Sequence, residues 1–197
     1  MSTEQQMSII ICPGIHELAI TQSFMDGWQS LFSDSSTPKD SENILIFPAQ
    51  GFSALSGFHI VQFMYGRLGD RLESSVVFIS FSAGVVGSIA AAWIWQLLGG
   101  NVKAFIAFDG WGVPLGGNFP IHRISHDYFT HWSSSCRLCG GEDDFYAQPA
   151  VDHLQLWRSP QTTQGYWVNS YYGGLSPHTP ISAAEFLLIL LERYGEI

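Results

Sequence analysis

The sequence predicts an α/β protein in which a mostly parallel central sheet lies between two layers of helices, a three-layer sandwich. Two observations carry this prediction. Short, continuous apolar runs recur along the first 110 residues, as expected of strands that are covered on both faces. Longer segments with apolar residues at helical spacing separate these runs. Alternating strands and helices form βαβ units, and such units build a parallel sheet with helices on both faces.

The first strand is predicted at residues 8–14, where the run SIIICPG ends in Pro-Gly. A helix is expected over residues 17–32, because Leu18, Phe24 and Trp28 recur at helical spacing and can share one face. Together these two segments form the first half of a βαβ unit.

The same alternation continues to Gly110. The run NILIFPAQ predicts a second strand, and the segment SALSGFHIVQFMYGRLGDRLE predicts a second helix. A third strand, a third helix rich in small residues and a fourth strand follow at residues 75–81, 83–98 and 102–110.

After Gly110 the pattern weakens. Residues 111–150 show no clear period and are interpreted as a lid or cleft insertion in a single domain spanning residues 1–197. The run VDHLQLWRS alternates like a strand, and an aromatic loop is expected over residues 160–180.

The last element is predicted to be a strongly apolar helix at residues 182–194. Ser182 and Glu185 form a Ser-x-x-Glu capping box at its start, just after Pro180.

Composition excludes some classes of function. The net charge is −9 and only 8 residues are Lys or Arg, so a nucleic-acid partner is not expected.

The chain starts without a secretory pattern, and its three cysteines are an odd number for a disulfide framework, so a cytoplasmic location is expected. Residues 74–102 carry no charge, but their strand-like and helix-like parts are joined by a Ser-Gly turn, so no transmembrane segment is expected.

The chemistry centres on Ser82, which lies where the third predicted strand turns into the third predicted helix. Ligands of open parallel sheets bind at the carboxyl ends of the strands. A tight turn would lift the hydroxyl clear of the sheet, and the free N–H groups at the helix start could bind an oxyanion. Small residues at positions 80, 83, 84 and 87 allow the helix and strand to approach closely.

The segment Ser80-Phe81-Ser82-Ala83-Gly84 resembles the nucleophile elbow Gly-x-Ser-x-Gly of the α/β-hydrolase family, with Ser in place of the first Gly. The resemblance extends in order of elements over most of the chain and implies a compact member that lacks the first hairpin. A further similarity, the Pro-Gly after the first strand, implies that the N–H groups of Ile15 and Ala83 form the oxyanion hole.

The resemblance also implies a base and an acid, in the order Ser, Asp or Glu, then His. His178 occupies the loop before the last helix and is the preferred base, with His126 and His153 as alternatives. Asp109, at the end of the fourth strand, is the preferred acid. The alternatives are Asp143 and Asp144, in a stretch similar to the family's Gly-x-x-Asp turn.

A histidine–cysteine cluster raises the question of zinc. Its spacing does not match that of known zinc fingers, so no metal and no cofactor is assigned from the sequence. The cluster consists of His122, His126, His131, Cys136 and Cys139.

The sequence thus favours a serine hydrolase that cleaves a carboxylic ester or thioester through a Ser-His-Asp triad. Aromatic residues at 111–129 and 157–172 are expected to cover the strand ends as a lid or acyl pocket, which favours an apolar acyl group. An acyltransferase remains open. The alternative is a catalytically inactive scaffold of the same fold that binds a small apolar ligand or a protein partner.

Overall fold

A computed structural model describes residues 7–29, 43–69, 74–134, 143–168 and 179–195. These residues form an α/β fold with a mixed, mostly parallel sheet of eight strands in the order β2-β1-β3-β4-β5-β6-β7-β8. Pairing is parallel from β2 to β6, and β7 runs antiparallel to both β6 and β8. The predicted fold class is confirmed.

The strands are short and, in the centre of the sheet, buried on both faces. They are β1 (Met7–Cys12), β2 (Ile44–Ile46), β3 (Ser75–Phe81), β4 (Asn101–Phe108), β5 (Ile121–Ser125), β6 (Asp144–Ala147), β7 (Gln164–Val168) and β8 (Thr179–Ser182).

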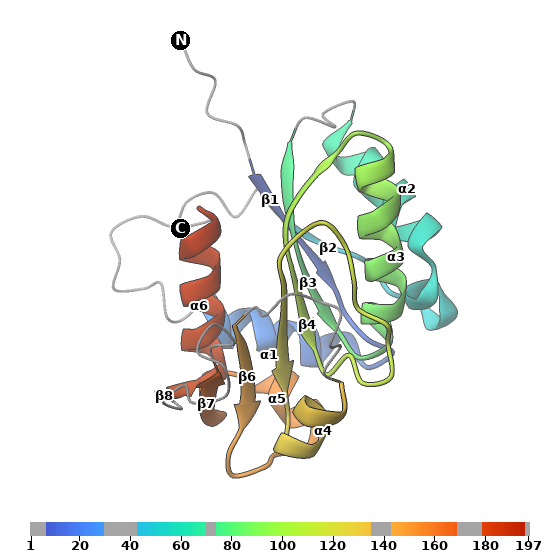
Figure 1. Cartoon of the computed structure of the whole chain (residues 1–197). Helices are drawn as coiled ribbons and strands as arrows, with labels where there is room; N and C mark the ends of the chain where they lie inside the picture. Colours follow the sequence, from blue (N-terminus) through green and yellow to red (C-terminus); the bar gives the residue numbers. More distant parts are fainter. Residues whose placement is uncertain (1–6, 30–42, 70–73, 135–142, 169–178, 196–197) are drawn as a thin grey trace.

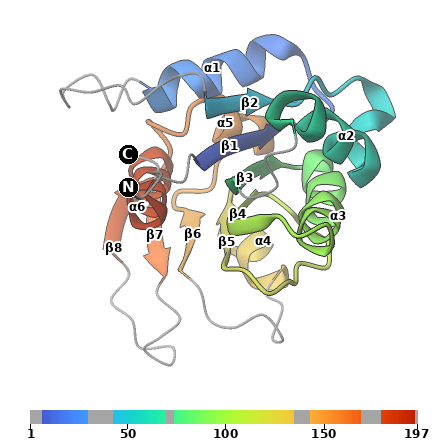
Figure 2. The ribbon, with the colours of Figure 1, turned by 90° about the horizontal axis from the view of Figure 1, so that it is seen from above.

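The helices cover both faces of this sheet. Figures 1 and 2 show α2 and α3 on one face and α1, α5 and α6 on the other. The helical elements are α1 (Leu18–Gln29), the 3₁₀ helix η3 (Gly51–Leu55), α2 (Gly57–Leu68), α3 (Ala83–Leu97), α4 (Tyr128–Ser133), α5 (His153–Arg158) and α6 (Ala183–Tyr194).

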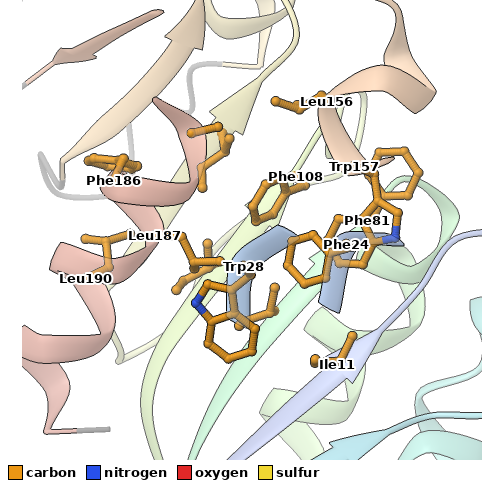
Figure 3. Close-up of a cluster of buried hydrophobic side chains, with 14 of the residues drawn as sticks. Ile11, Phe24, Trp28, Phe81, Phe108, Leu156, Trp157, Phe186, Leu187 and Leu190 are labelled. Carbon is orange, nitrogen blue, oxygen red and sulfur yellow. The ribbon is translucent and has the colours of Figure 1, made fainter. Parts of the chain in front are cut away.

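The side chains of each strand divide between two cores, one on each side of the sheet. The core beneath α1, α5 and α6 is rich in aromatic rings, as Figure 3 shows for Phe24, Phe81, Phe108 and Trp157. In this core Phe24 and Trp157 stack with ring centroids 3.8 Å apart. The stack joins α1 to α5, and α5 is the helix that carries His153.

Strand register sets the position of the site. Phe81, the last residue of β3, pairs with Phe108, the last residue of β4, so Ser82 and Asp109 leave the sheet side by side. Phe108 in turn pairs with Ile124 near the end of β5. Residues that follow these three strands therefore meet at one edge of the sheet, the edge formed by the carboxyl ends of the parallel strands.

The structure corrects the expected strand at residues 151–159, which contains helix α5. Asp152 occupies the N-cap position of this helix, and the consecutive residues Leu156 and Trp157 are both buried. Burial of two consecutive residues does not fit an alternating strand. A helix of six residues is too short to reveal its period in the sequence.

Residues 111–150, set apart as a lid or cleft insertion, supply two strands of the main sheet, β5 and β6. The expected aromatic loop 160–180 contains β7 and the first residues of β8. Both regions lacked a visible period because β5 to β8 are only four or five residues long.

The uncharged run at residues 74–102 contains β3, α3 and the first two residues of β4. In the described part of the chain, no helix combines the length and the apolar character that crossing a membrane requires.

A polar network ties α6 to β5 and β6. The fully buried ring of His122 donates from Nδ1 to the carbonyl of Asp143 at 2.7 Å, and its Nε2 accepts from the hydroxyl of Tyr194 at 2.7 Å. Arg193 pairs with the Asp143 carboxylate at 2.6 Å. Burial, together with the nearby Arg193 charge, lowers the pKa of His122 to about 4, although the bond to Asp143 favours protonation.

Stability should therefore fall as the pH drops below 6.5. The unfolded chain binds a proton at His122 near pH 6.5, whereas the folded protein resists it until about pH 4. We expect this histidine alone to reduce the free energy of unfolding by about 2 kcal/mol between pH 7 and pH 5. Urea unfolding at both pH values measures the change.

The matched comparison is His122→Gln, which keeps a donor and an acceptor and should show a smaller difference between the two pH values. His59→Gln, on the exposed surface of α2, should behave as wild type. Equal pH sensitivity in all three proteins would contradict the role given to His122.

Candidate active site

Ser82 lies on a strained turn between β3 and α3. Its backbone adopts φ 52° and ψ −121°, outside the region that residues with a side chain ordinarily occupy. The turn is held by its neighbours, because the N–H of Ser82 donates to the carbonyl of Phe108 and its carbonyl accepts from the N–H of Val85. Strain of this kind is typical of functional sites, where surrounding packing maintains it.

Small residues make the turn possible. A Cβ at Gly84 would lie 2.3 Å from the carbonyl oxygen of Cys12, and a Cβ at Gly14 would lie 3.1 Å from Cβ of Ser82. Ser80 stands in place of the glycine of the hydrolase pattern and is fully buried. Its paired neighbours, Cys12 and Ala107, are small as well, so the serine fits.

Three side chains form a hydrogen-bonded chain at this edge of the sheet. Oγ of Ser82 lies 3.0 Å from Nε2 of His153, and Nδ1 of His153 lies 2.8 Å from Oδ2 of Asp109. Since the carboxylate only accepts, the neutral ring carries its proton on Nδ1 and leaves Nε2 free to accept from the serine. This tautomer is the one that a general base requires.

Aromatic packing fixes the plane of the histidine. The rings of His153 and Phe81 stack with centroids 4.6 Å apart, and the rings of Phe81 and Trp157 stack with centroids 5.0 Å apart. Phe81 directly precedes Ser82, and Trp157 lies one helical turn after His153. Base and nucleophile are thus positioned by the same aromatic core.

Asp109 is the second residue held in a strained conformation. Among the described residues other than glycine, Asp109 and Ser82 have a positive φ, here 49°. The Asp109 side chain is almost fully buried. Burial raises its pKa, but hydrogen bonds from His126 and His153 outweigh this effect and hold the pKa below its usual value. Asp109 is therefore an ionised carboxylate inside the protein.

His126 is a second histidine on the same carboxylate. Its Nδ1 lies 3.0 Å from Oδ2 of Asp109, and its backbone N–H donates to Oδ1 at 2.9 Å. The hydrogen bond to Asp109 raises the pKa of His126 despite partial burial. The side chains of His126 and His153 are 25% and 42% exposed, so solvent reaches the cluster.

The expected oxyanion donors are the N–H groups of Ala83, which follows Ser82, and of Ile15. Ala83 is the first residue of α3, where N–H groups have no acceptor within the helix and the helix dipole favours negative charge. Ile15 follows Gly14, which packs against Ser82.

His16 is a further residue near the site, and the sequence pattern did not indicate it. Its ring lies edge-on to Phe81 with ring centroids 5.5 Å apart. Burial of the His16 ring, together with its electrostatic interaction with His153, lowers the pKa of His16.

Of the expected site residues, Ser82, Asp109, His126 and His153 are brought together. His178, the preferred base, lies outside the described residues. His153 takes the position beside the serine because β6 is the last parallel strand and α5 follows it, before the antiparallel pair β7–β8 and α6.

The alternative acids lie elsewhere. Asp143 and Asp144 come at the amino end of β6, whereas Ser82 follows the carboxyl end of β3. Asp144 forms an ion pair with Arg123, and Asp143 forms one with Arg193. Their carboxylates therefore stabilise the β5–β6–α6 region.

The histidine–cysteine cluster noted in the sequence is not assembled into one site by its described members. His122 is hydrogen-bonded to Asp143 and Tyr194, whereas His126 is bonded to Asp109. His131 lies on α4, and Cys136 and Cys139 fall outside the described residues.

Comparison with protein-family models finds no match for this chain, and comparison with curated proteins finds none either. The fold and the geometry of the site are thus the basis for any assignment of function.

Proposed function

We propose that this protein is a serine hydrolase of the α/β-hydrolase type that cleaves carboxylic esters or thioesters. The observation that carries the proposal is the hydrogen-bonded chain from Ser82 through His153 to the buried Asp109. It lies at the carboxyl edge of a mostly parallel sheet, where such folds bind their ligands.

In the proposed reaction Ser82 attacks the carbonyl carbon while Nε2 of His153 takes its proton. The imidazolium that forms is stabilised by Asp109. The tetrahedral oxyanion is bound by the N–H groups of Ala83 and Ile15. His153 then returns the proton to the leaving alkoxide or thiolate, and water repeats the sequence to release the acid.

Apolar side chains around this edge support an apolar acyl group. Exposed residues follow three different strands: Ile15 after β1, Trp111 after β4 and Phe129 after β5. Trp157, which was expected to belong to the lid, is instead fully buried in the core. The support for an apolar substrate therefore comes from exposed residues that follow the carboxyl ends of the strands.

A fluorophosphonate probe tests the proposal, because it reacts with an activated serine and needs no knowledge of the substrate. We expect the wild-type protein to be labelled and Ser82→Ala to remain unlabelled. Ser88→Ala is the matched control, since Ser88 lies buried in α3 and should leave labelling intact.

Peptide mapping of the adduct would locate the label on Ser82. A folded wild-type protein that does not react would refute the hydrolase and favour a ligand-binding scaffold.

If the protein is labelled, it is then assayed with p-nitrophenyl esters of increasing chain length. We expect kcat/KM to rise from acetate to medium-chain esters.

A further inference from the structure

We propose that Asp109, His126 and His153 form a binding site for Zn²⁺, and that the bound metal switches off the serine nucleophile. The effect on the nucleophile rests on the proposed function, whereas the metal site itself does not.

The first argument is the arrangement of ligand atoms. One atom each from Asp109, His126 and His153 lies within 4.8 Å of the others. Both ring Nδ1 atoms already lie 2.8–3.0 Å from the same oxygen, Oδ2 of Asp109. Two ligands on tetrahedral Zn²⁺ are about 3.4 Å apart, given bonds of about 2.0–2.2 Å. Each nitrogen–oxygen separation would therefore have to lengthen by roughly half an ångström to admit the metal.

The second argument is that the groups around the ligands suit a metal. A histidine that binds zinc usually donates its other ring N–H to an oxygen. Nε2 of His153 lies within hydrogen-bond distance of Oγ of Ser82, at 3.0 Å. Nε2 of His126 lies 3.7 Å from Oδ2 of Asp127, which is close enough for an ion pair but beyond hydrogen-bond distance. The backbone N–H of His126 holds Oδ1 of Asp109, which leaves Oδ2 for the metal.

The chemistry of the ligand set selects the ion. Two imidazoles and one carboxylate suit zinc and its transition-metal neighbours, whereas Ca²⁺ and Mg²⁺ prefer ligands that are all oxygen. Three protein ligands leave the fourth position of a tetrahedral ion for water. Solvent reaches both histidines, so the ion can enter.

Inactivation follows from the tautomer that the metal imposes. In the metal-free site, Nδ1 of His153 carries the proton and Nε2 accepts from Ser82. A metal on Nδ1 requires the lone pair there, so the single proton of the neutral ring moves to Nε2 through solvent. The ring then donates to Ser82 instead of accepting, and it no longer acts as the base.

The direct test is calorimetric titration of metal-free protein with Zn²⁺, without any assay of activity. We expect one ion per chain in the wild type. His126→Gln should weaken binding by about 10- to 100-fold, a loss that even an outer-sphere partner can cause. His59→Gln, which removes an exposed histidine of α2, should bind as wild type.

Tetrahedral Co²⁺ gives a second readout through its visible absorption, which should appear in the wild type and in Ser82→Ala. The proposed metal site would be refuted if the wild-type protein did not bind Zn²⁺ stoichiometrically. It would also be refuted if wild type and His126→Gln bound Zn²⁺ with equal affinity.

The effect on the nucleophile is measured as the rate of fluorophosphonate labelling with and without Zn²⁺. We expect Zn²⁺ to slow labelling of the wild type at least tenfold and a chelator to restore the labelling rate. The His126→Gln variant should need more Zn²⁺ for the same decrease in rate. Undiminished labelling of the Zn²⁺-bound protein would refute the switch. If metal-free protein is not labelled but still binds Zn²⁺ at this site, the hydrolase fails and the metal site stands.

Discussion

Replacement of His153 by Ala is expected to lower kcat for ester hydrolysis by about 10⁴-fold or more. The imidazole is hydrogen-bonded to both Ser82 and Asp109, so the variant loses the base and the group that protonates the leaving group. Removal of one member of a triad typically costs as much as removal of several, because the members act as a unit. Steady-state kinetics with the best p-nitrophenyl ester measure the loss.

His178→Ala is the decisive comparison, because the sequence pattern favoured His178 as the base. We expect its kcat to stay within a few-fold of wild type. The opposite result, an active His153→Ala and an inactive His178→Ala, would assign the base to His178. Thermal unfolding of both variants separates a loss of chemistry from a loss of fold.

Replacement of Trp157 by Ala is expected to have the largest effect on stability. The side chain is fully buried and stacks on Phe24 and Phe81, so its removal leaves a cavity between α1, α5 and the sheet. Removal of a buried Trp or Phe side chain costs about 3–5 kcal/mol. For a domain of this size, Tm should fall by about 6–20 °C.

The same variant should lose activity at temperatures where it is still folded. Trp157 supports Phe81, which stacks on His153, so the cavity loosens the base as well. Trp111→Ala is the control for stability, because this side chain is 66% exposed and should change the free energy of unfolding by less than about 1 kcal/mol. Equal midpoints for Trp157→Ala and wild type in urea would contradict the packing described for α5.

The first half of the fold was predictable because its signals are local. Four strands and three helices lie close to their predicted positions up to Gly110, where the apolar runs and the helical spacing are long enough to predict them. Beyond Gly110 the strands have only four or five residues, and α5 has six. Elements of this length are defined by their pairing and packing partners rather than by their own period.

The same division applies to the site. Ser82 could be located because the strand–turn–helix pattern and the small residues around it are contiguous in the sequence. The partners of the serine could not be ranked in the same way, because three of the seven histidines were candidate bases and the distance from β3 to α5 is a tertiary property. The resemblance placed the base in the loop before the last helix, where His178 occurs, and nothing in the sequence showed that α5 would bring His153 to the serine. His178 itself lies outside the described residues.

By itself, the sequence determined the α/β class, the parallel core and the position of the serine on its turn. Burial on both faces of a strand, helical spacing and a crowded turn each constrain neighbouring residues directly. Tertiary structure alone decided that His153 and His126 share the carboxylate of Asp109. Register between β3, β4 and β5, together with the ring stack of Phe81 and Trp157, brings these groups together from distant parts of the chain.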